Sequence, residues 1–225
     1  REEVDDDALI ALLRSPSIWP LRMLDVNSTQ ARDESGRWLA QWPPLAHVSE
    51  LTLADNALGD AAVVALAASP FVEGLRKLDL GFNPLTDEAA RALAASPHLT
   101  KLTWLGLYSC QLTAEGMVAV LTSPRLPALR RCVIGASGFS AAHARALVTA
   151  PHAPALCELR LDWFRLGDEA LVALAPWRGF EHVELLMLAH NDLGAAGAIA
   201  LANAPLHALE ELDLSNNAID DAGLE

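Results

Sequence analysis

The sequence predicts an α/β repeat solenoid, in which one short strand and one helix recur along the whole chain. The first observation is a leucine that returns every 27 residues, with one cysteine as the only replacement. The second is a further apolar residue two positions later, so that each pair faces one side of a strand. The third is a change to helical spacing about ten residues farther on. A fixed period of this length is typical of solenoids, whose units pack on their neighbours. The register runs through Leu24, Leu51, Leu78, Leu105, Cys132, Leu159 and Leu186, and Leu212 follows one residue early.

The strands are expected to form one parallel sheet, because each strand must lie beside its counterpart in the next unit. The helices then cover the other side. Helices are about 10–12 Å wide and strands lie about 4.8 Å apart, so the stack curves into a horseshoe with the sheet on its concave face. The strand-bearing segments are expected at 21–31, 48–58, 75–85, 102–112, 129–139, 156–166, 183–193 and 209–219.

Each helix has a start signal and a stop signal. Capping residues precede the helices, and carboxylates such as Asp60 and Asp87 follow in the first turn, where the helix dipole favours them. Proline then ends most helices. The expected caps are Gly59, Thr86, Thr113, Ser140, Gly167, Gly194 and Asp220, and the prolines are Pro16, Pro43, Pro70, Pro97, Pro124, Pro151 and Pro205.

The units read Leu-x-x-Leu-x-Leu-x-x-Asn-x-Leu, as in LRKLDLGFNPL at 75–85 and LEELDLSNNAI at 209–219. This pattern resembles the leucine-rich repeat over essentially the whole chain. The helical half, DEAARALAASP at 87–97, is similar to the ribonuclease-inhibitor-like subfamily, and most of all to its alanine-rich bacterial arrays. The resemblance implies a strand and a true α-helix in every unit.

The resemblance also implies that the asparagine of each unit bonds backbone groups of neighbouring turns. Cysteine, threonine and serine are accepted substitutes, so Cys110 is expected to be a residue of this ladder and Cys132 a core residue. Phe164 cannot make such bonds, and we expect its turn to be distorted. The ladder positions are Thr29, Asn56, Asn83, Cys110, Ser137, Phe164, Asn191 and Asn217.

We expect residues 1–225 to form a single array of about eight 27-residue repeats, either monomeric or part of a larger chain. Residues 1–17 match the helical half of a repeat and are expected to cap the front. Residues 209–225 match a truncated last repeat. Both ends therefore suggest a piece of a longer protein.

The composition of the chain narrows the classes of partner that it could bind. The chain has 16 basic and 29 acidic residues and a net charge of −13, which repels phosphate backbones and argues against nucleic acid or an anionic membrane. A solvated acidic surface and a basic protein partner are both compatible with this charge. No apolar run approaches the ~18–20 residues that span a bilayer, and the acidic start is no signal peptide. Three cysteines without paired spacing favour a reducing cytoplasm.

No catalytic constellation emerges from the sequence. The segment 135–140 lacks the five-residue frame of a nucleophile elbow, and the seven histidines lack ligand spacing. The carboxylates recur because the repeat recurs, so capping explains them better than acid–base chemistry. We therefore expect no enzyme, no metal and no cofactor.

The concave face carries residues that the repeat does not explain. The only tyrosine, Tyr108, is flanked by Gly81, Gly106, Gly135 and Ala136, which we expect to leave shallow dents beside a protruding ring. Aromatic anchors ringed by charge are typical of protein interfaces. The predicted protein-binding residues are Phe82, Trp104, Tyr108, Val133, Trp163, Leu185 and Met187.

These residues also admit a purely structural interpretation. Trp104 could stack on Arg131 or Lys77 and cover strand backbone. We expect Arg131, Glu158 and Arg160 to form an ion-pair ladder with Asp162 rather than to face a partner. The favoured function is a non-enzymatic module that binds a protein on its concave face. The alternatives are a regulator of an enzyme, similar to ribonuclease inhibitors or GTPase-activating relatives, and a structural spacer in a larger protein.

Overall fold

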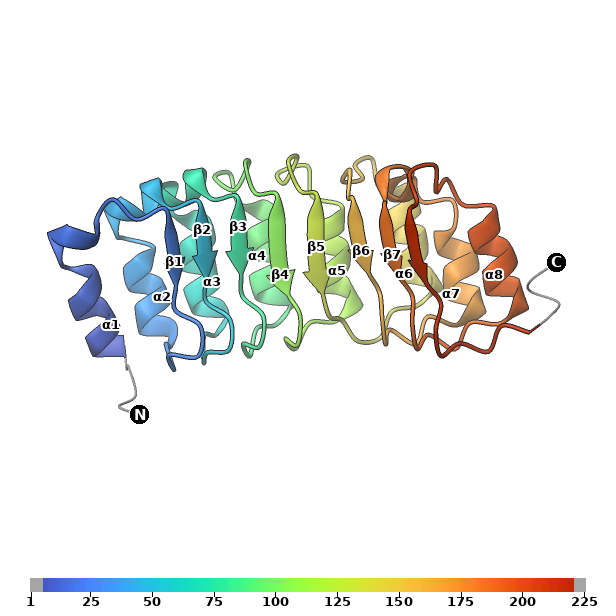
Figure 1. The fold of residues 1–225 in the computed structure, drawn as a ribbon, viewed down its shortest axis with the longest axis horizontal. Coiled ribbons are helices and arrows are strands. Elements are labelled where there is room, and N and C mark those ends of the chain that lie inside the picture. Colours follow the sequence, from blue (N-terminus) through green and yellow to red (C-terminus); the bar gives the residue numbers. More distant parts are fainter. Residues whose placement is uncertain (1–5, 221–225) are drawn as a thin grey trace.

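The computed structural model describes residues 6–220 as a two-layer array, with one sheet in front and the helices behind it (Figure 1). The sheet contains eight strands in chain order, and all neighbouring strands are parallel. Leu24 pairs with Leu51 and Leu159 with Leu186, which is the 27-residue register. The predicted parallel sheet and helical layer are confirmed. The assignment of residues 1–17 as a cap and 209–225 as a truncated repeat stays a prediction, since both segments extend beyond the described residues.

The elements are short and regular. The strands are β1 (Met23–Asp25), β2 (Glu50–Thr52), β3 (Lys77–Asp79), β4 (Trp104–Leu107), β5 (Arg131–Ile134), β6 (Glu158–Arg160), β7 (Leu185–Met187) and β8 (Glu211–Asp213). The α-helices are α1 (Asp6–Leu13), α2 (Asp33–Leu39), α3 (Asp60–Ala68), α4 (Asp87–Ala95), α5 (Ala114–Leu121), α6 (Ala141–Thr149), α7 (Gly167–Leu174) and α8 (Ala195–Ala202). Short 3₁₀ helices follow four of them, namely η1 (Pro16–Ile18), η2 (Pro43–His47), η3 (Pro70–Gly74) and η4 (Arg178–His182).

The core lies between the two layers and consists mainly of the register leucines. Leu51, Leu105 and Leu159 are completely buried. Cys132 takes the same place and is also completely buried, and this burial raises the pKa of its thiol to about 12. Its predicted role as a core residue is confirmed. Leu212 is 39% exposed because β8 is the last strand of the sheet.

The asparagine of each repeat holds the turn of the repeat before it. The side-chain amide of Asn83 donates to the carbonyls of Leu53 (2.9 Å) and Leu80 (3.0 Å). Its oxygen accepts the backbone N–H of Leu58, one repeat back, at 3.0 Å. Each amide therefore ties two successive turns together. Asn56, Asn191 and Asn217 bond the preceding turn in the same way.

Cys110 occupies this ladder as predicted. Its thiol donates to the carbonyl oxygen of Leu80 in the preceding repeat, at 3.5 Å. Burial raises the pKa of this thiol above its ordinary value, so it remains a hydrogen-bond donor.

The distortion expected in the turn of Phe164 is not found. Its own turn keeps the left-handed conformation found elsewhere, with φ 65° at Trp163, so it is not distorted. The irregular turn lies one repeat earlier, where Ala136 is not left-handed although its equivalents in the other repeats are. The reason is the direction of the ladder, since a ladder residue holds the turn before it. Phe164 is buried instead, with its ring edge-on to Phe139 at 6.2 Å between centroids.

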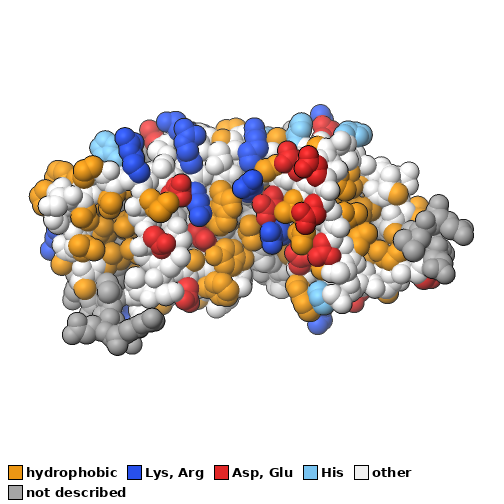
Figure 2. All heavy atoms as spheres, viewed as in Figure 1, with side chains coloured by type: hydrophobic (Ala, Val, Ile, Leu, Met, Phe, Trp, Pro, Cys, Tyr) orange, Lys and Arg blue, Asp and Glu red, His pale blue; other side chains and the backbone are white. Residues whose placement is uncertain are grey.

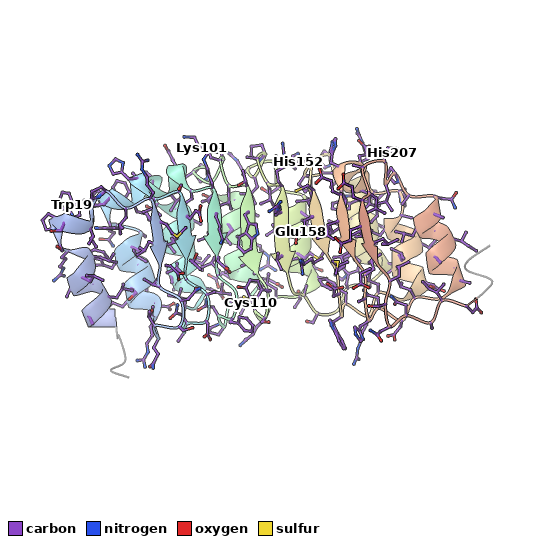
Figure 3. The ribbon with its side chains drawn as sticks, viewed as in Figure 1. Trp19, Lys101, Cys110, His152, Glu158 and His207 are labelled. Atoms are coloured by element: carbon purple, nitrogen blue, oxygen red, sulfur yellow. The ribbon has the colours of Figure 1, made fainter. Side chains whose placement is uncertain are left out.

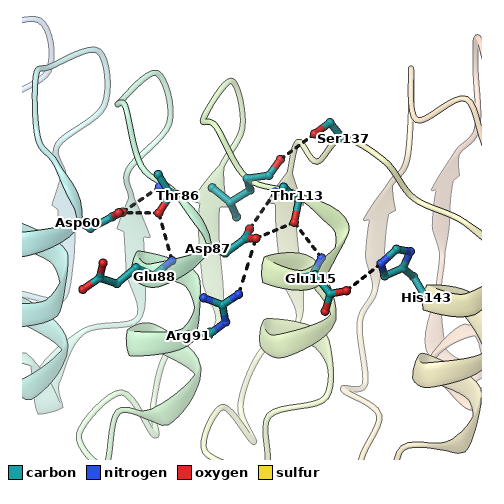
Figure 4. Close-up of polar contacts among 10 residues, drawn as sticks. Asp60, Thr86, Asp87, Glu88, Arg91, Thr113, Glu115, Ser137 and His143 are labelled. Atoms are coloured by element: carbon teal, nitrogen blue, oxygen red, sulfur yellow. Dashed lines mark hydrogen bonds and ion pairs between the residues drawn. The ribbon is translucent and has the colours of Figure 1, made fainter.

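A second ladder joins the helix starts (Figure 4). Asp60 accepts the backbone N–H of Thr86 at 2.8 Å and its hydroxyl at 2.6 Å, and Asp87 does the same for Thr113 at 2.8 and 2.6 Å. Both threonines cap their own helices as predicted. The first-turn aspartates therefore do more than favour the helix dipole, because they fix the cap of the next repeat. The sequence pattern did not reveal this second role.

The remaining caps divide into three groups. Gly59, Ser140 and Gly194 precede their helices as predicted. The N–H groups of Gly59 and Gly194 donate to Asp33 and Asp168, each at 2.7 Å. The expected cap Gly167 is wrong, because it lies inside α7 with φ 60° and Leu166 precedes the helix. The helix expected after Asp220 lies outside the described residues.

The ladder predicts a specific cost for Asn83→Ala. The carbonyl and N–H groups that this buried amide satisfies would lose their partner, which is expected to lower the free energy of unfolding by about 2–4 kcal/mol. Chemical denaturation monitored by circular dichroism measures the change. Asn27→Ala is the control, since Asn27 is exposed, and it is expected to change stability by less than about 0.5 kcal/mol. Equal losses in the two variants would contradict the ladder.

Candidate functional site

The predicted binding residues divide into three groups in the structure. Phe82, Trp104 and Tyr108, which we call the central patch, lie on β4 and in the turns after β3 and β4. The rings of Phe82 and Tyr108 meet edge to face at 5.3 Å. Trp163 stacks instead on His190, at 3.5 Å and 11°. Val133 pairs in register with Gly106 of β4, and Leu185 and Met187 lie farther along on β7. The seven residues therefore form no single contact cluster.

A charged trio lies between the central patch and β7. The carboxylate of Glu158 is 2.7 Å from Arg160 and 3.7 Å from Arg131. Figure 2 shows this mixed group of red and blue side chains between apolar areas of the same face. The expected ion pairs are confirmed for these three residues. Asp162 is not part of the trio, because its carboxylate accepts the backbone N–H of Ala189 at 3.0 Å.

Asp79 holds the central patch from beneath. The hydroxyl of Tyr108 donates to Asp79 Oδ2 at 3.1 Å, and Oδ1 accepts the backbone N–H of Gly81 at 3.1 Å. Asp79 is only 8% exposed. Burial and the adjacent Asp79 carboxylate raise the pKa of Tyr108 to about 12. The phenol thus stays protonated and its ring is fixed. The sequence pattern did not point to this role.

The dents expected at Gly81 and Gly106 are wrong. The ring of Tyr108 lies where a side chain on Gly81 would be, and the ring of Trp104 lies over Gly106. Flat rings gain dispersion contacts by lying on exposed backbone, and glycine permits that approach. A hollow of about 380 Å³ is instead found toward β1 and β2. It is lined by Asn27, Ser28, Ala54 and Asp55 together with Phe82 and Tyr108.

Trp104 also makes the contact that the structural interpretation anticipated. The Lys77 ammonium lies 5.2 Å from the centre of its ring, within cation–π range. Lys77 and Asp79 therefore frame the patch with opposite charges. The Tyr108 hydroxyl is thus hydrogen-bonded to Asp79, and the Trp104 ring contacts Lys77.

The rim, defined here as the turn residue two or three positions after the end of each strand, contains the most exposed aromatic rings. Phe82 is 55% exposed and Trp163 is 70% exposed. Both are left-handed, with φ 53° and 65°. This conformation is unfavourable for bulky side chains, at a cost of roughly 1–3 kcal/mol. Other repeats place smaller or polar residues at the same left-handed position, namely Ser28, Asp55, Ser109, His190 and Asn216.

The described residues offer little else for chemistry. Within 6–220, no group of three or more His, Cys, Asp or Glu side chains is placed to hold a metal ion. Cys110, Cys132 and Cys157 are all free thiols. Among the helices of the described part, none is both long and apolar enough to cross a membrane.

Comparison with known proteins agrees with the repeat. The family model for the Leucine Rich repeat matches residues 45–67, 75–94, 181–202 and 206–225. These segments coincide with units of the eight-stranded parallel sheet. The fold is a leucine-rich repeat solenoid. No curated protein sequence matches the chain significantly.

Two solved leucine-rich repeat structures illustrate the likeness. An internalin, inlF from Listeria monocytogenes str. 4b F2365, superposes with a TM-score of 0.58 at 19% identity, over 92% of this chain and 52% of that one. The TLR13 protein, solved in complex with ssRNA13, superposes with a TM-score of 0.52 at 19% identity, over 96% of this chain and 27% of that one. The array thus spans about half and about a quarter of these chains. At such identity the likeness shows the fold alone.

The single tyrosine of this array allows a direct test of the Tyr108–Asp79 pair. We expect phenolate absorbance to titrate near pH 12 in the folded protein and near pH 10 in denaturant. Between these values only the unfolded chain releases the proton, so stability should fall as the pH rises from 10 to 12. A rapid pH jump read by ultraviolet absorbance separates titration from unfolding.

Asp79→Asn is the matched variant for this titration. It removes the carboxylate charge and keeps the shape, so the pKa of Tyr108 should move down toward 10 while part of the shift, due to burial, remains. A folded-state midpoint near 10 in the wild type, or no change in the variant, would contradict the pair.

Proposed function

We propose that this array is a non-enzymatic interaction module that holds a protein partner on its concave face and rim. The observation that carries the proposal is the pair Phe82 and Trp163, which are exposed aromatic rings at left-handed backbone positions. Neither burial nor backbone preference explains a bulky ring there. Strained, exposed residues of this kind concentrate at functional sites.

The central patch is suited to binding because it is already ordered. Asp79 fixes Tyr108 and Lys77 lies against Trp104, so little side-chain entropy remains to be lost on association. Rigid aromatic side chains provide large contact areas at low entropic cost. In this proposal Phe82, Trp104 and Tyr108 are one anchor group and Trp163 is another. Val133, Leu185 and Met187 extend the apolar contact.

Other features support a protein as the partner. Proteins of this fold are generally interaction modules and generally lack enzymatic activity. One structural neighbour was solved with single-stranded RNA. The net charge of −13 and the carboxylate at Asp55 beside the central patch argue against a phosphate backbone here. We further propose a ribonuclease-inhibitor-like, bacterial, monomeric array located in the cytoplasm, which the free thiols favour. No specific observation favours either alternative function, the enzyme regulator or the structural spacer.

The test uses the rim rather than Tyr108, because Tyr108→Ser would leave the buried Asp79 carboxylate without its hydroxyl partner. Phe82→Ser combined with Trp163→Ser introduces the residue that other repeats carry at this position, as at Ser28 and Ser109. We expect unchanged or slightly raised thermal stability and at least a tenfold loss in partner affinity. Quantitative affinity purification from the native cell, with calorimetry on the recovered partner, measures both.

The matched control is Val172→Ser, which removes a 49% exposed apolar side chain on α7, in the helical layer. It should leave capture unchanged. Undiminished capture by the double variant, or equal loss in the control, would contradict binding at the concave face and rim.

A further inference from the structure

A second hollow lies away from the concave face, between the segments that lead into β1 and β2. Its volume is about 790 Å³, compared with about 380 Å³ beside Tyr108. Trp19, Trp38 and Trp42 line it together with four prolines. Figure 3 labels Trp19 at this end of the array. The volume is within the range of about 300–1,000 Å³ that is typical of ligand sites. We call this hollow the tryptophan groove.

Trp38 is not required by the repeat, since every later helix from α3 to α8 carries alanine at its position. Trp42, like the buried Trp177, takes the position of Ser69 and Ser96, whose hydroxyls donate to carbonyls one repeat back, each at 2.6 Å. Trp42 cannot make that bond and is buried with its ring 6.1 Å from Trp38. Trp19 is 50% exposed and lies outside the core. The signal in the sequence was three of the six tryptophans within residues 19–42, all outside the strands.

The polar walls of the groove are basic. Arg14, Arg22 and His47 line it, and no carboxylate does, in a chain that has 29 acidic residues. Neither Arg14 nor Arg22 forms an ion pair with any described residue. Figure 2 shows blue side chains continuing along the edge where the strands begin, at the top of the view. The segments before β3, β4 and β5 carry further exposed basic residues that form no ion pair with any residue in 6–220. They are Arg76, Lys101 and Arg125.

We propose that the tryptophan groove binds an extended acidic peptide segment of a partner protein. Proline or other apolar side chains of the peptide lie against Trp19 and Trp38, and its carboxylates face Arg14 and Arg22. Aromatic-lined grooves suit extended, proline-containing segments, whose conformation is already ordered before binding. Charge complementarity selects the acidic flank. This site is separate from the concave face and does not depend on the function proposed for it.

A short peptide fits the local charge better than a nucleic acid does. Six extended residues span about 20 Å and stay within the basic neighbourhood. A longer polyanion would extend beyond the arginines toward the carboxylates that give the chain its net charge of −13. The peptide meets only the arginines and the apolar floor.

The experiment selects random short peptides, displayed on phage, for binding to the intact 225-residue chain. Peptides that also bind a Trp19→Ser/Arg22→Glu variant are removed first. Both side chains are exposed, so the variant should fold, which its thermal unfolding verifies. We expect the enriched peptides to be rich in Asp and Glu with interspersed proline or large apolar residues. Synthetic copies should bind with micromolar Kd, and Trp19→Ser and Arg22→Glu should each weaken binding at least tenfold.

Phe82→Ser is the control, since it alters the concave face alone, and it should leave peptide binding unchanged. The inference is overturned if the enriched peptides are basic, if no peptide depends on Trp19 and Arg22, or if Phe82→Ser abolishes binding. It is also overturned if a single-stranded RNA oligonucleotide binds the groove more tightly than any peptide. The inference is likewise overturned if the chain dimerises and Trp19→Ser abolishes the dimer. In that case the occupant of the groove is a second copy of the chain.

Discussion

The structure depends on the amide that each repeat sends back to the turn before it. The single side chain of Asn83, for example, makes three such bonds. It bonds a carbonyl of its own turn, a carbonyl of the previous repeat and an N–H of the previous turn. Such bonds keep the sheet parallel and in register, because a shift of one residue would break all of them together. In the helical layer, the contacts of Asp60 with Thr86 and of Asp87 with Thr113 likewise tie each repeat to the next. Substitution at one ladder position is therefore felt in the neighbouring repeat, as the turn before Phe164 demonstrates.

The ladders also determine which residues are free for other roles. Leucines, asparagines and helix-start aspartates are committed to stacking, so exposed aromatic residues require another explanation. Phe82 and Trp163 stand at positions where the backbone prefers a small or polar side chain. Trp38 stands where every later helix from α3 to α8 carries alanine. In both places the chain departs from what stacking favours, which natural proteins do mainly at functional sites. Two separate surfaces follow, one on the concave face and rim and one at the basic edge.

The sequence predicted the layers, register and core because the repeat constrains them strongly, and Cys110 and Cys132 were assigned correctly for the same reason. It predicted less well wherever a side chain contacts another repeat. The Asp79–Tyr108 hydrogen bond joins residues 29 apart, and the rings over Gly81 and Gly106 depend on rotamers that periodicity does not specify. The misplaced distortion at Phe164 arose because the pattern shows which residues bond and not in which direction. The tryptophan groove was missed because most of its residues lie in the connections between the repeating elements.

Amide hydrogen exchange along the turns tests the ladder most directly. Leu58 and Leu166 occupy equivalent positions, and their N–H groups donate to Asn83 and Asn191 of the following repeats. Phe139 is the equivalent residue before Phe164, which has no amide to offer. We predict slow exchange at Leu58 and Leu166 and exchange at Phe139 that is faster by about tenfold or more, corresponding to one lost hydrogen bond. Equal protection at all three amides would contradict the claim that each repeat is held by the one that follows it.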